Sequence, residues 1–145
     1  MPKELFSVHI NAPKEKVWKV LWNDDTYRKW TVPFSEGSYM ESDWQIGGRT
    51  LFLGSEGNGM VSTIDELKEN EIMSFKHLGM IKDGKEDLES EEVKQWAGLL
   101  ETYTLESTEN KTTLSVEMDL ADDHKEYFME AFPKALNLVK ELAEK

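Results

Sequence analysis

The C-terminal stretch of the sequence constrains the fold more than any other feature. From about Asp122 onward, apolar residues recur at intervals of three and four positions, which predicts one long amphipathic helix. Its apolar stripe comprises Phe128, Phe132, Ala135, Leu136, Val139, Leu142 and Ala143. Pro133 lies inside this segment and lacks a backbone N–H, so we expect a kink or a late helix start there. A single helix with such a stripe needs a partner surface elsewhere in the chain.

Short strand patterns supply that partner surface. Phe6, Val8 and Ile10 alternate with polar residues, which is typical of a half-buried strand. Further strand patterns, separated by turn residues, fall at residues 37–42, 49–54, 59–65, 71–78, 99–106 and 112–120. The last two are predicted to form a hairpin about Glu109-Asn110-Lys111.

Two short helices are predicted between the first strand and the others. Residues 13–22 have helical spacing of apolar residues. Asn23-Asp24-Asp25 is expected to stop that helix and to cap a second short helix that runs through Trp30. Pro33 ends this helix. The highly charged stretch 81–94 is predicted to be a solvated loop with a helical turn near its end.

This order of elements predicts the fold class. One strand, two short helices, about six antiparallel strands and a long helix favour an α+β fold. In it, a strongly curved antiparallel sheet of about six to seven strands wraps around the C-terminal helix, and the two early helices close one end. A length of 145 residues suits one domain, so residues 1–145 are predicted to form a single domain.

Composition excludes several classes of function. The chain has 17 Lys plus Arg against 29 Asp plus Glu, a net charge of −12, which disfavours binding to nucleic acid or to anionic lipid. It has no cysteine, so disulfides, zinc–thiolate sites and thiol catalysis are excluded. Short apolar runs and the absence of a leader pattern predict a cytoplasmic protein that does not insert into membranes. Neither nucleotide motifs nor a zinc spacing of histidines is present, and we expect no cofactor and no metal.

Two residues are candidates for chemistry. His77 shares one strand face with Met73 and Phe75, and Glu101 shares another with Tyr103. If these faces point inward, His77 borders a cavity and Glu101 is a carboxylate in an apolar pocket, where it could serve as a general acid or base. The alternatives are a structural histidine and a strand register, shifted by one residue, that turns Glu101 to water.

The other histidines and one arginine favour surface roles. His9 alternates away from its apolar neighbours and is predicted to face outward. His124, beside two aspartates, is expected to be a solvated cap of the last helix. Arg49 is expected in a surface ion pair, with pairing to Glu101 or anchoring of an acidic ligand group as the alternative.

Aromatic residues are the expected lining of a cavity, with packing in the core as the alternative for each. Trp96, after the acidic stretch, is in addition a candidate for part of a lid. The predicted cavity residues are Trp30, Tyr39, Trp44, Phe75, His77, Trp96, Glu101, Tyr103, Phe128 and Phe132.

Five motifs, in this order and spacing, resemble a known family. They are Ile10-Asn-Ala-Pro-Lys-Glu-Lys-Val17-Trp18, Tyr27-Arg-Lys-Trp30, Asp43-Trp-Gln-Ile-Gly47-Gly48-Arg49, Gly59-Met-Val61 and Thr113-Leu-Ser-Val116. Together they resemble the SRPBCC superfamily of START-like, helix-grip domains. Within it, the sequence is most similar to the family of heat-shock-protein-90 ATPase activator homologues.

The resemblance implies a deep cavity between the curved sheet and the long helix, where members of the superfamily bind lipids, hormones or polyketides. The leading expectation is therefore a domain that binds a small hydrophobic or amphipathic molecule. The first alternative is a cyclase or dehydratase that uses Glu101 or His77, since some members are such enzymes. The second is a chaperone-accessory protein. It is less favoured because the eukaryotic activator has a preceding chaperone-binding domain, whereas this sequence starts at the first strand. The ligand and the oligomeric state stay open.

Overall fold

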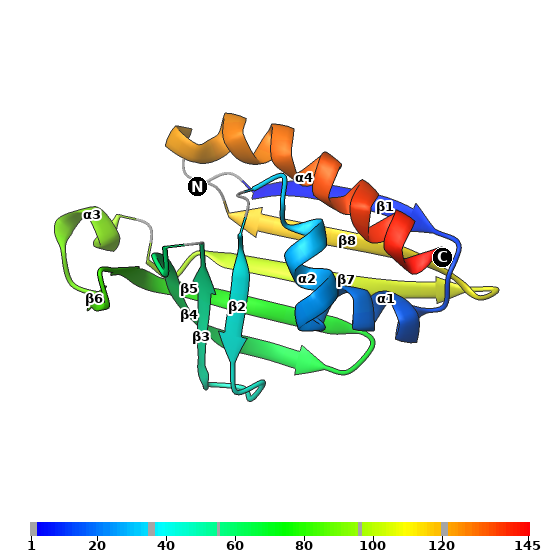
Figure 1. Ribbon diagram of the computed structural model, residues 1–145, viewed down its shortest axis with the longest axis horizontal. Helices are drawn as coiled ribbons and strands as arrows, with labels where there is room; N and C mark the ends of the chain where they lie inside the picture. The colour runs from blue at the N-terminus through cyan, green and yellow to red at the C-terminus, as the bar shows by residue number, and fades with distance from the viewer. Residues whose placement is uncertain (1–2, 35–36, 55, 96, 120–121) are drawn as a thin grey trace.

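The computed structural model describes residues 3–34, 37–54, 56–95, 97–119 and 122–145, with the backbone alone at 122–124. Figure 1 shows the chain with its elements labelled. The elements, in chain order, are β1 (Lys3–Ile10), α1 (Lys14–Trp22), α2 (Asp24–Trp30), β2 (Tyr39–Ser42), β3 (Arg49–Leu53), β4 (Gly59–Lys68), β5 (Ile72–Lys82), β6 (Lys85–Asp87), α3 (Glu91–Lys94), β7 (Leu100–Thr108), β8 (Lys111–Asp119) and α4 (Asp122–Ala143).

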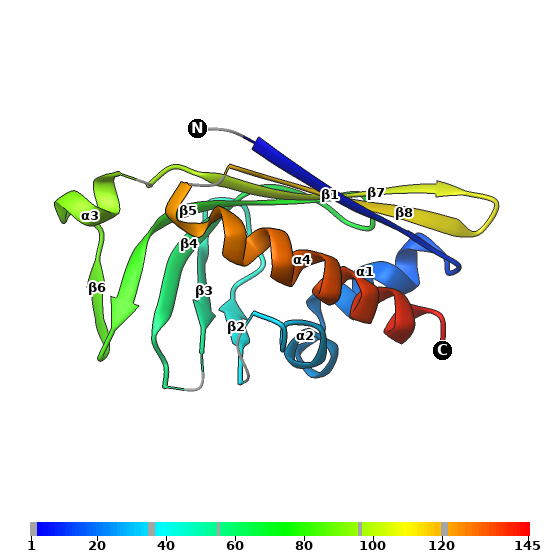
Figure 2. The same cartoon turned by 90° about the horizontal axis from the view of Figure 1, so that it is seen from above.

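The strands form one antiparallel sheet in the order β1-β8-β7-β5-β4-β3-β2, and β6 pairs with β5 beside this path. Figure 2 shows that β1, β7 and β8 lie in one layer, whereas β2, β3 and β4 turn away from it on the side of α4. The register of β4 against β5 shifts between Val61 and Ser62 and again between Ile64 and Glu66. Such bulges bend a strand and increase its twist, which accounts for the curl. The predicted α+β helix-grip fold is confirmed.

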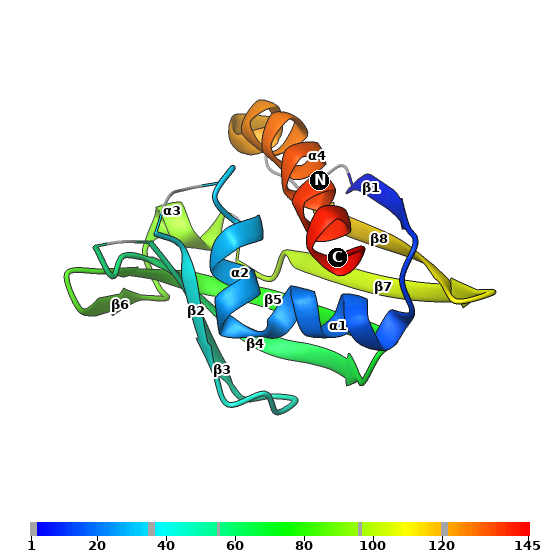
Figure 3. The same cartoon turned by 45° about the vertical axis from the view of Figure 1, so that its right-hand side comes forward.

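Helix α4 lies across the concave face of the sheet, and α1 and α2 pack beside its C-terminal half (Figure 3). The ring of Phe132 stacks on that of Phe6 in β1, with centroids 4.8 Å apart. The helix is continuous across Pro133, so the late start that we considered is wrong. The buried residues of α4, among its described side chains, are Ala131, Phe132, Ala135, Leu136, Val139 and Ala143.

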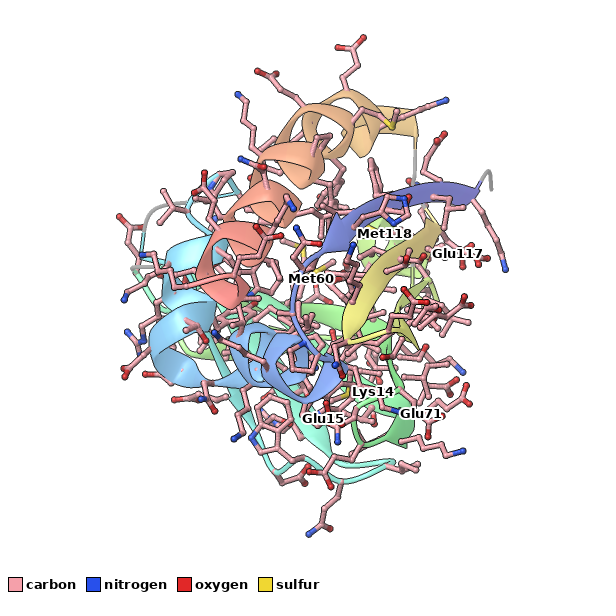
Figure 4. All side chains as sticks on the ribbon, turned by 90° about the vertical axis from the view of Figure 1, so that its right-hand side faces the viewer. Lys14, Glu15, Met60, Glu71, Glu117 and Met118 are labelled. Carbon is pink, nitrogen blue, oxygen red and sulfur yellow. The ribbon has the colours of Figure 1, made fainter. Side chains whose placement is uncertain are left out.

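Alternation along the strands separates core from solvent as the sequence predicts. In β8, Met118 is buried on the side of α4, whereas its neighbour Glu117 is exposed on the far side of the sheet (Figure 4). The register pairs Glu101 with Met118 and Tyr103 with Val116. One side of the β7–β8 hairpin is therefore an apolar surface that carries a single carboxylate.

The β7–β8 hairpin closes as predicted, through a turn that needs an unusual backbone. Thr108 pairs with Lys111, so Glu109 and Asn110 form a two-residue turn with φ of 53° and 64°. Positive φ at both positions is the requirement of a type I′ turn, whose twist matches that of the strands. The local sequence therefore determines the register that places Glu101 opposite Met118.

The stretch 81–94 differs from the prediction of a loop. Strand β5 continues to Lys82, and a tight turn at Asp83-Gly84 returns the chain as β6, which pairs with β5. Gly79 permits this pairing, because a Cβ there would stand 2.2 Å from the Asp87 carbonyl oxygen. The helical turn near the end is confirmed as α3, with the Ser90 side chain as its N-cap.

The start of α2 also differs in detail. Asn23 is its N-cap residue, but the Asn23 side chain makes no capping hydrogen bond. Asp24 instead accepts a hydrogen bond from Arg28, one turn later on the same helix. The helix ends at Trp30, three residues before Pro33.

Candidate functional site

A cavity of about 380 Å³ lies between the concave face of the sheet and α4. Residues of α2, β3, β4, β5, β7, β8 and α4 contribute to its wall, so it depends on the whole curved sheet. Its apolar wall includes Trp30, Phe52, Met60, Tyr103, Met118, Phe128 and Phe132.

A chain of four hydrogen-bonded side chains lies at one side of this cavity. The Oγ atom of Ser62 is 2.7 Å from Nδ1 of His77, and Nε2 of His77 is 3.2 Å from Oε1 of Glu101. The hydroxyl of Tyr103 donates to Oε2 of Glu101 at 2.5 Å. His77, Glu101 and Tyr103 line the cavity, and Ser62 is fully buried behind His77.

Strand register brings these four residues together. Ser62 of β4 is directly opposite His77 of β5. Glu101 of β7 is opposite Phe75, so it is diagonal to His77, a distance that long side chains bridge. Tyr103 is two residues from Glu101 on the same strand and points to the same face. Both faces point inward, so for Glu101 the alternative register that turns it to water is excluded.

The charge of Glu101 affects the pKa of two tyrosines in the cavity. Burial, then the charge of Glu101 and its hydrogen bond, raise the pKa of Tyr103 well above its ordinary value. Burial, then the charge of Glu101, also raise the pKa of Tyr27. Both phenols are therefore neutral hydrogen-bond donors at neutral pH.

Tyr27 is a cavity residue that the sequence reasoning missed. Its ring meets that of Trp30 edge to face, with centroids 5.2 Å apart, and both side chains line the cavity. In the described part of the chain, no side chain is hydrogen-bonded to the Tyr27 hydroxyl. The helical spacing of three positions between Tyr27 and Trp30 was the available signal. Ser62 gave none, because its role depends on the pairing of β4 with β5.

Six of the predicted cavity residues lie at the cavity and three do not. Trp30, His77, Glu101, Tyr103, Phe128 and Phe132 line it. The prediction is wrong for Phe75, which is fully buried one layer further in, behind Phe52, with ring centroids 5.0 Å apart. It is also wrong for Tyr39, whose ring lies under the Arg28 guanidinium at 5.1 Å.

Trp44 is likewise outside the cavity, and the prediction that it lines it is wrong. It has a positive φ of 59° in the turn between β2 and β3, which directs its side chain to the surface, where 39% of it is exposed. Its ring contacts Trp22, and the two border a second pocket with Met40. Trp96, the predicted lid residue, lies outside the described residues.

The remaining candidates occupy the surface. His9 is exposed, and its Nδ1 lies 3.0 Å from Oγ1 of Thr113. Arg49 forms a surface ion pair with Glu86 of β6, in keeping with the expectation. The side chain of His124 lies outside the described residues.

Two further properties bear on the kind of site. The described residues contain no group of three or more histidine or acidic side chains arranged to hold a metal ion. Within the same residues, no helix has the length and apolar character needed to cross a bilayer.

A curved antiparallel sheet that wraps around a C-terminal helix, with a cavity between them, defines a helix-grip protein of the SRPBCC class. The sequence model of the family described as Activator of Hsp90 ATPase homolog 1-like protein matches residues 11–144. The chain belongs to this family.

Solved structures agree in fold. The Aha1 dimer from Colwellia psychrerythraea is 19% identical, with a TM-score of 0.73 over 99% of this chain and 97% of that chain. A protein from Chromobacterium violaceum is 18% identical, with a TM-score of 0.70 over 100% and 99%. One from Mesorhizobium loti is 16% identical, with a TM-score of 0.71 over 97% and 96%. At these identities the likeness shows the fold alone. No curated protein matches the sequence.

Proposed function

We propose that the protein binds a small, largely apolar molecule in the cavity between the sheet and α4. One observation carries this proposal: a cavity of about 380 Å³ with a largely aromatic and apolar wall that also presents Glu101 and His77. Ligand sites of proteins are concave, mostly apolar and roughly 300–1,000 Å³ in volume. The cavity is equivalent to about a dozen waters at roughly 30 Å³ each, so it suits a compact ligand.

The division of the wall also supports a bound molecule with one polar end. The rings of Trp30, Phe128 and Phe132 offer apolar contact, whereas Glu101 and His77 offer hydrogen bonds. Burial of a ligand's apolar surface contributes roughly 25 cal/mol per Å² removed from water. A few polar groups at fixed positions then select its orientation.

The test is a titration with the neutral probe N-phenyl-1-naphthylamine, followed by calorimetry and by amide shifts. We expect binding, with shifts concentrated at cavity residues. Met60→Trp fills the cavity and should abolish binding, whereas Met129→Trp makes the same change at an exposed position of α4 and should not. Binding that survives Met60→Trp, or shifts confined to the surface, would contradict the proposal.

An enzyme that abstracts a proton next to a carbonyl group is a second candidate. The hydrogen bond between His77 and Glu101 inside the cavity favours it, because a carboxylate held in this way can accept a proton from a bound substrate. The test incubates the protein with small cyclic ketones in D₂O and measures deuterium at the α-carbon. Exchange that Glu101→Gln abolishes supports this function, and exchange at the uncatalysed rate in the native protein contradicts it.

The family description names an activator of the Hsp90 ATPase, which makes a chaperone-accessory role the third candidate. It is tested by the ATPase rate of purified Hsp90 with and without an excess of this protein. Stimulation that Met60→Trp leaves intact would assign the role to the surface and not to the cavity.

A further inference from the structure

Acidic side chains outnumber Lys and Arg in the described part of the cavity wall. Two carboxylates line it, Glu101 and Asp119, and no Lys or Arg is found among the described residues of its wall. Asp119 accepts a hydrogen bond from the backbone N–H of Leu100 at 3.2 Å. The side chain of Glu101 is only 14% exposed, so little bulk water screens its charge. A ligand therefore meets a negative field at the polar side of the cavity.

The hydrogen bonds of Glu101 do not require a compensating cation. A carboxylate only accepts, so Nε2 of His77 is the donor in their contact. In the neutral imidazole, Nδ1 is then free to accept from the Ser62 hydroxyl, which lies 2.7 Å away. A neutral His77 thus suffices to complete the four-residue chain, and with a neutral imidazole the negative charge of Glu101 is shared with hydrogen-bond donors but not cancelled.

Glu101 also has room for a further donor. Two carboxylate oxygens offer about four acceptor positions, and Tyr103 and His77 use one each. Tyr103, which donates to Glu101, belongs to a group of aromatic rings: its centroid is 6.4 Å from that of Trp30, and the centroids of Trp30 and Tyr27 are 5.2 Å apart. The faces of such rings attract cations.

We infer that the cavity selects an amine, a ligand whose cationic nitrogen binds Glu101 and whose apolar body lies against the aromatic wall. This inference rests on the proposed function and names the ligand class of the same site. An acidic ligand such as a fatty acid is disfavoured, because its carboxylate would meet Glu101 and Asp119 with no Lys or Arg of the described wall between them.

The test compares three probes that share one alkyl chain: decylamine, decanol and decanoic acid. Affinities are measured by calorimetry at about 150 mM salt, where screening beyond roughly 8 Å suppresses attraction to the acidic surface. We expect the amine to bind at least about tenfold more tightly than the alcohol, as for a charge-assisted hydrogen bond, and the acid to bind most weakly.

Two variants assign the effect to the cavity. Glu101→Gln keeps the shape of the side chain. It should bring the ratio of the amine's affinity to the alcohol's affinity close to one. Glu106→Gln removes the same charge from an exposed position of the same strand and should leave the preference unchanged. A preference that Glu101→Gln does not alter would overturn the inference.

The native protein alone also decides the question, should Glu101→Gln fail to fold. Equal affinity for amine and alcohol, or tightest binding of the acid, overturns the amine inference and leaves the proposed function in place. Failure of all three probes to bind contradicts the proposed function itself.

Discussion

Nε2 of His77 lies 3.2 Å from Oε1 of Glu101, although the two residues are 24 positions apart and belong to different strands. Neither residue is unusual within its own strand. The contact exists because β5 and β7 pair with Phe75 opposite Glu101, which places the two polar side chains on a diagonal of the concave face. The polar side of the cavity is therefore a product of sheet register.

The first prediction concerns the phenol that donates to Glu101. Tyr103→Phe keeps the ring but removes the hydrogen bond to a largely buried carboxylate, so the free energy of unfolding should fall by about 1–3 kcal/mol. Urea unfolding of the native protein and of the variant measures this difference in free energy. In the double variant with Glu101→Gln the loss should be smaller than the sum of the single losses, and additive losses would show that the two groups do not interact.

The second prediction concerns the imidazole of His77. Since Glu101 can only accept, neutral His77 should carry its proton on Nε2. Long-range ¹H–¹⁵N correlation spectra distinguish the two tautomers directly. Ser62→Ala should leave the proton on Nε2, because the carboxylate and not the hydroxyl determines its position. A ring protonated on Nδ1 in the native protein would refute this arrangement.

The third prediction is a loss of stability at alkaline pH. Burial, and next the charge of Glu101, raise the pKa of Tyr27 and Tyr103 in the folded protein, whereas an unfolded tyrosine ionises near pH 10. Above about pH 10 the folded state therefore holds more protons. The free energy of unfolding should then fall by about 1.4 kcal/mol per pH unit for each of the two tyrosines.

Urea unfolding at intervals between about pH 8 and pH 11 checks this slope. The free energy should be insensitive to these two groups below about pH 9. Tyr27→Phe should make the decline above pH 10 less steep. A stability that stays constant up to about pH 11 would mean that the phenols are not held neutral by the fold.

The fourth prediction concerns Gly59, which begins β4 at the cavity wall. A Cβ at this position would stand 1.8 Å from the backbone carbonyl oxygen of Phe52, which cannot move without breaking the β3–β4 pairing. Gly59→Ala should therefore destabilise the protein by about 3 kcal/mol or more, at or above the upper end of the usual cost of overpacking. Gly57→Ala is the comparison, because its Cβ meets nothing and only its positive φ of 78° opposes the change.

Gly57→Ala should lower the free energy of unfolding by about 1–2 kcal/mol, because a residue with a Cβ is strained in the left-handed backbone conformation. Thermal or urea unfolding ranks the two variants. A Gly59→Ala protein as stable as Gly57→Ala would contradict the close approach of β3 and β4.

Much of the fold could be predicted because the signals are local. The apolar stripe of α4, the alternation in β7 and β8, and the turn at Glu109-Asn110 each specify an element without help from the rest of the chain. The same alternation grouped His77 with Met73 and Phe75, and Glu101 with Tyr103, but did not decide which strand face points inward. The sequence thus predicts which residues share a strand face.

The remainder depends on relations between elements. Ser62 meets His77 only because the register of β4 shifts beside it, and no sequence period marks such a bulge. Phe75 has the inward orientation expected, but Phe52 of β3 covers it, which follows from the curl of the sheet. In the same way, β6 exists because Gly79 admits a neighbouring backbone.

The attachment of α4 differs between its two halves. Its buried side chains, in the described part of the helix, begin at Ala131, and Pro133 cannot donate the backbone hydrogen bond that would join it to the preceding turn. Ahead of that point, the helix is held by Tyr127, whose hydroxyl bonds the Phe34 carbonyl, and by the contact of Phe128 with Phe34. Together with the ion pair between Lys125 and Glu4 of β1, these surface contacts join the first turns of α4 to the rest of the protein, whereas the half of the helix from Ala131 onward is embedded in the core.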